Sequence, residues 1–348
     1  MKKILPFIII GMIIVGVIFF YQKNSKDNKV DTSKWSNYTE EEKTVIENLS
    51  KENQDLLLNL PYSEKYAKVI SEKEFKEENL SVYLKALNKL DIENTIYIVN
   101  NNFYDDNINY DENSLNFMHA TYYIHDNLER YLNYQKENNL SIDEIITRIN
   151  SNLDYEYYTN MQPTDLSKKY LILVNKYNYL EKDYVPDNLV NIDSNYGING
   201  YLEATTYEAF KKMTDAALEE NVNLYAYSPY RSYTTQYNLY NRYGERDGYN
   251  QADTYSARAG SSEHQTGLAI DITRKGGSLN GFENTNEFKW LQKHATEYGF
   301  ILRYPKGKEY ITGYQYESWH YRYVGVEVAK KIQELGITFE EYYAYFVK

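Results

Sequence analysis

Two short motifs constrain most strongly what this chain can fold into. The first lies at residues 262–271 and the second at residues 317–320, and together they hold two of the five histidines in the 348 residues. Two neutral imidazoles and one carboxylate can serve as three ligands of a catalytic zinc ion, with the fourth position left to water. A chain that uses His264, Asp271 and His320 in this way must bring two distant segments to one point. Glu317 is then a free carboxylate that can accept the proton of that water.

The first motif has the alternation of a half-buried strand. In residues 268–272, Ala269 and Asp271 share one face, and the three aliphatic side chains share the other. Asp271 is therefore expected to point towards the site, with only a methyl group beside it. Gly267 supplies a turn that can carry His264 back over the end of this strand.

The second motif does not fit one regular strand. Glu317 and His320 are three residues apart, which places them on opposite faces of an ideal strand. We therefore expect Glu317 in an irregular segment just before the strand. His320 and Arg322 are then expected to face the site, and Tyr321 and Tyr323 to face away from it.

Two other interpretations fit the same residues. A histidine beside a carboxylate is often only a hydrogen-bonded pair inside a fold. Two histidines and one carboxylate also form the facial triad of non-haem iron oxygenases. The iron interpretation is disfavoured, because those enzymes need a β-barrel framework with closely spaced ligands, and the chain has neither.

Several motifs together resemble one known family. They are Ser262-x-His264-x-x-Gly267-x-Ala269-x-Asp271, Glu317-x-Trp319-His320, and Ser228-Pro229-Tyr230-Arg231-Ser232 followed by Gln236. In this order they closely resemble the VanY-type zinc D-alanyl-D-alanine carboxypeptidases, which share a metal-site architecture with lysostaphin-type endopeptidases and hedgehog domains. The similarity begins near residues 171–176 and 184–189 and continues to residue 348.

The resemblance implies a role for each matching residue. It implies zinc as the cofactor, His264, Asp271 and His320 as its ligands, and Glu317 as the catalytic base. Arg231 corresponds to the family arginine that contacts the substrate and stabilises the oxyanion, a task that suits a permanently charged guanidinium. The resemblance also suggests that Ser262 and Gln236 contact the terminal carboxylate of the substrate. It suggests Trp319 as a further substrate contact.

The implied activity is removal of the C-terminal D-alanine from peptidoglycan stem peptides. The same motifs also serve L,D-carboxypeptidases and some endopeptidases that act on wall peptides. A non-catalytic, metal-stabilised module that binds wall peptides is a further alternative, although such a module has no need of Glu317 beside its metal.

The region before the catalytic motifs indicates where the protein works. Residues 4–21 carry no charge, and eighteen helical residues nearly span a bilayer core of about 30 Å. We expect residues 1–22 to be a single-pass transmembrane anchor, with a cleaved signal peptide as the alternative, and residues 23–36 to be a linker. Lysines flank the segment on both sides, so the outward, wall-facing placement of the body rests on the resemblance.

Composition excludes some classes of site and partner. The chain has no cysteine, so a metal site must use histidine and carboxylate. The net charge of −12 argues against a nucleic-acid partner. The sequence does not indicate an oligomeric state. An anionic substrate also requires local positive charge within this acidic chain. The sequence offers four candidates near the motifs: Arg231, Arg303, Lys306 and Lys308.

Periodicity predicts two kinds of structure. Residues 37–160 show helical spacing, with a faint repeat in which residues 79–100 parallel residues 127–150. We favour a spacer for this region, over a module that positions the catalytic domain along the wall or binds a partner. Residues 165–348 form the predicted catalytic domain, an α+β fold with a small antiparallel sheet and flanking helices. Its strands are predicted at residues 223–228, 268–273, 300–304 and 319–324, and its helices include 205–219 and 285–298. Capping boxes are predicted at Thr205 and Thr338.

Overall fold

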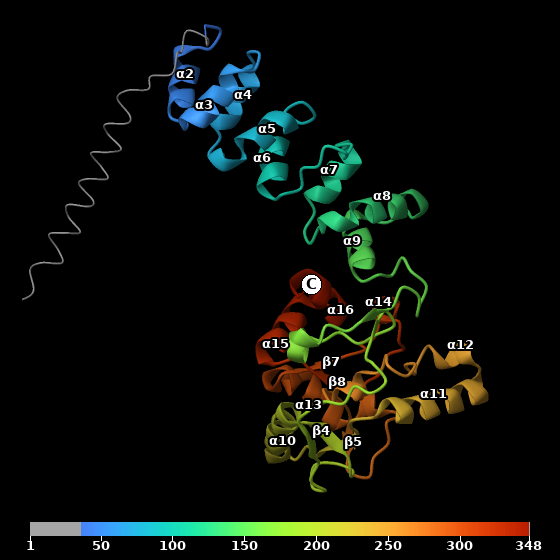
Figure 1. Cartoon of the computed structure of the whole chain (residues 1–348). Coiled ribbons are helices and arrows are strands. Elements are labelled where there is room, and N and C mark those ends of the chain that lie inside the picture. Colours follow the sequence, from blue (N-terminus) through green and yellow to red (C-terminus); the bar gives the residue numbers. More distant parts are fainter. Residues whose placement is uncertain (1–35, 348) are drawn as a thin grey trace, which may run out of the picture. The chain divides into compact units, whose positions relative to one another are not determined.

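The structure, a computed structural model, describes residues 36–347 (Figure 1). These residues divide into two compact units. The division falls between His119 and Ala120, inside the region that the sequence predicts to be helical. No helix among these residues is both long enough and apolar enough to cross a membrane. The predicted anchor at residues 4–21 lies outside the described residues, and it stays a prediction.

The first unit consists of short helices. Several begin at a capping side chain: Thr39 forms a capping box with Glu42, and the carboxylates of Asp91 and Asp111 accept backbone hydrogen bonds. The helices are α2 (Glu40–Glu47), α3 (Lys51–Leu58), α4 (Glu64–Ile70), α5 (Leu80–Ala86), α6 (Ile92–Asn100) and α7 (Glu112–Met118).

The second unit begins with two more helices and continues into the mixed catalytic fold. Its helices are α8 (Leu128–Glu137), α9 (Ile142–Asn150), α10 (Ala204–Glu219), α11 (Tyr233–Asp247), α12 (Tyr249–Ala252), α13 (Asn286–His294), α14 (Glu309–Thr312), α15 (Val326–Leu335) and α16 (Phe339–Phe346). Its strands are β1 (Gln162–Pro163), β2 (Asn178–Tyr179), β3 (Leu189–Asn191), β4 (Tyr201–Glu203), β5 (Leu224–Ser228), β6 (Ala269–Arg274), β7 (Phe300–Leu302) and β8 (His320–Tyr323).

The same pair of hydrogen bonds connects α5 with α6 in the first unit and α8 with α9 in the second. In the first unit, the Tyr83 hydroxyl donates to Asn100 Oδ1 at 2.6 Å, and Asn100 Nδ2 donates to the carbonyl of Glu74. In the second unit, the Tyr131 hydroxyl donates to Asn150 Oδ1, and Asn150 Nδ2 donates to the carbonyl of Tyr122. The repeat seen in the sequence therefore corresponds to one small helical motif that is present twice.

The central sheet of the catalytic part has the strand order β5-β6-β8-β7, and every neighbouring pair is antiparallel. All four strands lie close to the predicted ranges, and the two central strands, β6 and β8, are buried on both faces along almost their whole length. The α+β class with a small antiparallel sheet is thereby confirmed for this part of the chain. The structure adds two short pairs that the sequence did not predict, β1 with β2 and β3 with β4.

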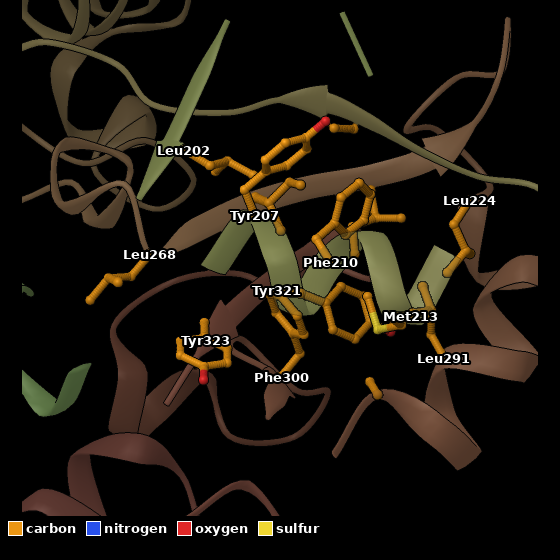
Figure 2. Close-up of a cluster of buried hydrophobic side chains, with 14 of the residues drawn as sticks. Leu202, Tyr207, Phe210, Met213, Leu224, Leu268, Leu291, Phe300, Tyr321 and Tyr323 are labelled. Carbon is orange, nitrogen blue, oxygen red and sulfur yellow. The ribbon is translucent and has the colours of Figure 1, made fainter. Parts of the chain in front are cut away.

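Helices α10 and α13 cover the face of the sheet opposite the metal-binding motifs. Phe210 and Met213 of α10 and Leu291 of α13 pack against Phe300 and Tyr321 in one buried cluster (Figure 2). Tyr321 and Tyr323 both belong to this core, so they face away from the motifs as predicted. A β-bulge between Ala226 and Ser228 ends the regular part of β5 beside Asp271.

One predicted helix cap is wrong and another is confirmed. Helix α10 begins one residue earlier than expected, at Ala204, and its cap is Glu203, whose carboxylate accepts from Thr206 N at 2.7 Å. A carboxylate satisfies the free N–H groups of a first turn as well as a hydroxyl does, so the threonine pattern was misleading. The capping box of Thr338 with Glu341 opens α16 as predicted.

Candidate metal centre

Sheet register and one tight turn bring three potential ligands together. Asp271 on β6 lies directly opposite His320 on β8. His264 lies in the 3-10 turn Glu263–Thr266 that precedes β6. One ligand atom from each of the three residues lies within 4.8 Å of the other two, and all three side chains are buried. The structure thus brings together the two sequence motifs that predicted the site.

The backbone after β5 orients His264. The Nδ1 atom of His264 donates to the carbonyl of Pro229 at 2.8 Å, because a carbonyl can only accept. The Nε2 atom therefore carries the lone pair, and it lies 3.4 Å from Asp271 Oδ1. The carbonyl of His264 in turn accepts from the backbone N–H of Arg231 at 3.2 Å. Gly267 ends the turn at a φ of 70°, a conformation that favours glycine.

The second histidine completes a donor set that fits zinc. The Nδ1 atom of His320 lies 3.2 Å from Asp271 Oδ1. His264 Nε2 and Asp271 Oδ1 are buried, and neither has a hydrogen-bond partner within the protein. Leaving such atoms unpaired is costly, and a divalent cation between them satisfies both. Two imidazoles and one carboxylate form a set that binds catalytic zinc.

In the metal-free protein, the charge states of His264 and Asp271 suit metal binding, whereas His320 must release a proton to become a ligand. Burial, together with the positive charge of Arg231, lowers the pKa of His264 to about 4, so this ring is neutral at physiological pH. Burial alone raises the pKa of a carboxyl, yet the two histidines hold the pKa of Asp271 well below its usual range. Burial opposes protonation of His320 as well, but Asp271 and Glu263 raise its pKa to about 9.

Glu317 lies beside the three ligands in an irregular segment before β8, as expected. Its Oε2 atom is 3.6 Å from His320 Nδ1, and its side chain is 14 % exposed. Its backbone N–H donates to the carbonyl of Tyr304 at 3.1 Å. Burial, and secondarily the nearby Asp271, raise the pKa of Glu317 to about 7. A carboxyl with this pKa can take up and release protons near neutral pH.

A cavity of about 410 Å³ opens over the centre. All eight site residues predicted from the sequence line it: Arg231, Gln236, Ser262, His264, Asp271, Glu317, Trp319 and His320. The buried Nε atom of Arg231 has no hydrogen-bond partner. A ligand in the cavity thus meets polar groups as well as the aromatic ring of Trp319.

Gln236 presents a different atom from the one that the sequence prediction required. Its Nε2 atom donates to the carbonyl of Ala257 at 2.6 Å, whereas its buried Oε1 atom has no partner. A free carbonyl oxygen accepts an N–H group and cannot bind a carboxylate. Gln236 is therefore placed to contact a substrate amide rather than a terminal carboxylate.

Three of the four cations proposed to attract an anionic substrate do not line this cavity. Arg303 is fully buried between Glu263 and Glu340, so its charge is already paired. Lys306 and Lys308 line a separate cavity of about 390 Å³. The closeness of these three residues to the motifs in the sequence therefore did not predict where their side chains lie in the fold. Arg231 does line the cavity over the metal centre.

Sequence reasoning also missed residues that contact the centre. Tyr304 lines the cavity, and its ring packs against His320 with a centroid distance of 4.8 Å. Glu263 lies behind His320 and was passed over, although it is adjacent to His264 in the first motif. Its proximity to a ligand was visible in the sequence, whereas its contacts with distant residues were not.

The chain matches a family model described as VanY, D-alanyl-D-alanine carboxypeptidase, over residues 199–326. It is 39% identical over 208 residues to the putative carboxypeptidase YodJ of Bacillus subtilis, an alignment that covers 55% of this chain and 75% of that protein. It is also 32% identical over 185 residues to the bifunctional D-Ala-D-Ala dipeptidase and carboxypeptidase VanXYC of Enterococcus gallinarum, covering 51% of this chain and 95% of that protein. The chain belongs to the VanY family.

Solved structures are similar to the same half of the chain. The LdcB LD-carboxypeptidase is 41% identical, with a TM-score of 0.50, and the match covers 53% of this chain and 90% of LdcB. A VanY D,D-pentapeptidase from a VanB-type vancomycin resistance cassette, solved in complex with Zn(II), is 32% identical with a TM-score of 0.44 over 49% of this chain and 97% of that one.

VanY membership confirms the enzyme class that the sequence predicted, a metallo-carboxypeptidase. It also agrees with zinc as the cofactor, for which the histidine and carboxylate donors at the centre are suited.

Proposed function

We propose that this protein removes the C-terminal D-alanine from peptidoglycan stem peptides by zinc-dependent hydrolysis. One observation carries the proposal: His264, Asp271 and His320 converge beneath an open cavity that Glu317 also lines. VanY membership supports the substrate class, because the matching family model is described by its action on D-alanyl-D-alanine.

The three ligands would hold zinc, which supplies Lewis-acid chemistry and makes water nucleophilic near neutral pH. Glu317 accepts a proton from the attacking water and returns it to the leaving amine. Its pKa of about 7 allows both transfers, since neither protonation state is strongly favoured at neutral pH.

Arg231 stabilises the negative charge that develops on the carbonyl oxygen. Its guanidinium lines the cavity and stays charged throughout the reaction. We assign Ser262 to the terminal carboxylate of the substrate, because its hydroxyl can donate a hydrogen bond. Gln236 accepts a hydrogen bond from a substrate N–H through its free Oε1 atom.

A second candidate function is L,D-carboxypeptidase activity on tetrapeptide stems. One observation favours it, which is the 41% identity to the LdcB LD-carboxypeptidase over 53% of this chain. The two activities share the metal chemistry and differ only in the stereochemistry of the bond that the cavity accepts. An endopeptidase reaction within wall peptides is a variant of the same chemistry.

Digestion of defined stem peptides tests these assignments. The purified protein is incubated with a pentapeptide ending in D-alanyl-D-alanine and, separately, with the tetrapeptide that lacks the last residue. Mass spectrometry then follows the release of D-alanine. Release from the pentapeptide that stops with chelator and returns with added zinc supports D,D-activity, and release from the tetrapeptide alone supports L,D-activity. Binding of both peptides without cleavage of either would instead support a non-catalytic wall-peptide module.

The proposed substrate also suggests a location. We propose a single-pass membrane protein whose catalytic part faces the cell wall, because the uncharged residues 4–21 are long enough to serve as an anchor. Protease added to intact, wall-stripped cells should remove the catalytic part from the membrane fraction. Complete protection until the cells are lysed would contradict this location.

A further inference from the structure

A cluster of four charged side chains lies fully buried behind the metal centre. Glu263 Oε1 accepts from Arg303 Nε and from Arg322 Nη1, both at 2.8 Å. Arg303 also donates through both terminal nitrogens to Glu340 on α16, at 2.8 and 2.6 Å. The charges of the two carboxylates and the two guanidiniums sum to zero. Buried charges are tolerated in a fold when they are paired in this way. The second oxygen of Glu263 takes no part in these bonds.

That second oxygen faces a ring atom of a metal ligand. Glu263 Oε2 lies 3.5 Å from His320 Nε2, and both atoms are buried with no hydrogen-bond partner in the protein. On the opposite side of the ring, His320 Nδ1 lies 3.2 Å from Asp271 Oδ1. The two nitrogens of His320 thus face two different carboxylates, one within the ligand group and one behind it.

We infer that Glu263 is a positioning residue that accepts the Nε2 proton of His320 and so directs the Nδ1 lone pair towards the metal. A neutral imidazole has one donor nitrogen and one acceptor nitrogen, and an ionised carboxylate can only accept. The carboxylate behind the ring therefore fixes which nitrogen binds the cation. The two arginines hold this carboxylate ionised and in one orientation, since both bond to its other oxygen.

The two histidine ligands are thus oriented by different groups. The backbone carbonyl of Pro229 fixes the tautomer of His264, whereas the side chain of Glu263 fixes that of His320. A backbone carbonyl is present whatever the side chain, but the contact with His320 depends on one residue that can be replaced. This inference rests on the metal site of the proposed function and does not depend on which peptide bond is cut.

The experiment compares E263Q with E340Q in the full chain. Both substitutions remove one negative charge from the same buried cluster, but only Glu263 faces His320. Zinc affinity is measured by competition with a chromophoric chelator, and thermal unfolding of the metal-free proteins reports the cost to the fold. We expect E263Q to bind zinc about 10–100-fold more weakly, the usual effect of removing a partner of a ligand. E340Q is expected to lose stability and to keep the parent affinity.

Parent-like zinc affinity in E263Q overturns the inference, and so does equal weakening in E340Q. A second measurement needs no variant, in case E263Q does not fold. The parent protein with ¹⁵N-labelled histidine is loaded with ¹¹³Cd, and its five histidines give few ring signals to resolve. We expect cadmium coupling to His320 Nδ1 and a slowly exchanging proton on Nε2. Coupling to Nε2 would overturn the inference.

These results separate the inference from the proposed function. Weaker zinc binding in E263Q together with the expected tautomer supports the role of Glu263 even if the parent protein releases no D-alanine. Conversely, release of D-alanine combined with parent-like zinc affinity in E263Q would leave the proposed function intact and refute the positioning role.

Discussion

Glu317 differs from the other acidic residues of the centre in its charge state. Histidines hold the pKa of Asp271 low, whereas burial raises that of Glu317 to about 7. Two carboxyls in one site therefore have separate tasks, one as a permanent anion and one as a proton carrier. The contrast arises because Asp271 contacts both imidazoles, while Glu317 approaches only His320.

Replacing Glu317 should affect turnover much more than metal binding. We expect Glu317→Ala to retain its zinc and to lose at least roughly a hundredfold in kcat, the scale expected for a positioned acid–base group. Metal content by mass spectrometry and steady-state release of D-alanine test the two halves of this prediction. A variant that cleaves at the parent rate would show that the base is another residue.

The raised pKa of Glu317 also predicts how stability depends on pH in the metal-free protein. A carboxyl whose pKa rises on folding, here from 4.5 to about 7, stabilises the fold while protonated. That contribution is lost as pH rises through about 7. Metal-free E317Q should therefore gain stability relative to the metal-free parent from about pH 5 to about pH 8, by roughly 1.4 kcal/mol per unit of pKa shift. Urea denaturation across this range measures the difference, and parallel curves would contradict the prediction.

At the scale of residues, the sequence predicted the polar lining of the centre well. Spacing predicted that Asp271 and His320 each face the site, and the resemblance supplied Arg231, Gln236, Ser262 and Trp319. The sequence did not predict that Arg303 is buried, because the carboxylate that pairs with it, Glu340, is 37 residues away in the chain. Nor did it predict which atom of Gln236 is free, which depends on the position of the Ala257 carbonyl.

Among the elements, those with a strong hydrophobic alternation were predictable. The four strands of the main sheet carry apolar or aromatic residues at alternate positions, and this period of two is visible in the sequence although β6 and β8 are buried on both faces. Strands β1 to β4 have only two or three residues each, and unlike the three-residue β7 they lie outside the main sheet. They pair because surrounding segments hold them together, which no local pattern reveals.

The turn that carries His264 depends on a glycine. Gly267 has a φ of 70°, and a Cβ built there lies 3.0 Å from the backbone nitrogen of Glu203 and from a methyl group of Leu189. A non-glycine residue in the left-handed conformation costs about 1–2 kcal/mol by itself. We expect Gly267→Ala to destabilise the metal-free protein by more than this, because its Cβ also meets Glu203 and Leu189. Gly336→Ala is the matched control, because its φ is 64° with open space around it. Equal losses in urea denaturation would show that the contact with Glu203 is unimportant.

On the scale of the whole molecule, the chain divides into two compact units, and the metal centre lies entirely in the second. A ligand stabilises only the parts of a protein whose unfolding releases it. Zinc should therefore slow amide hydrogen exchange in β6 and β8, while α5 and α6 of the first unit keep their metal-free rates. Hydrogen exchange followed by mass spectrometry, with and without zinc, checks this. Equal protection of both units would indicate that they unfold as one.

The position of Glu340 in the chain has a consequence for biosynthesis. Until the ribosome has passed this codon, the two buried arginines have only Glu263 to balance them, and an uncompensated charge in a dry interior costs several kcal/mol. The buried cluster therefore reaches charge balance only once α16 has joined the fold.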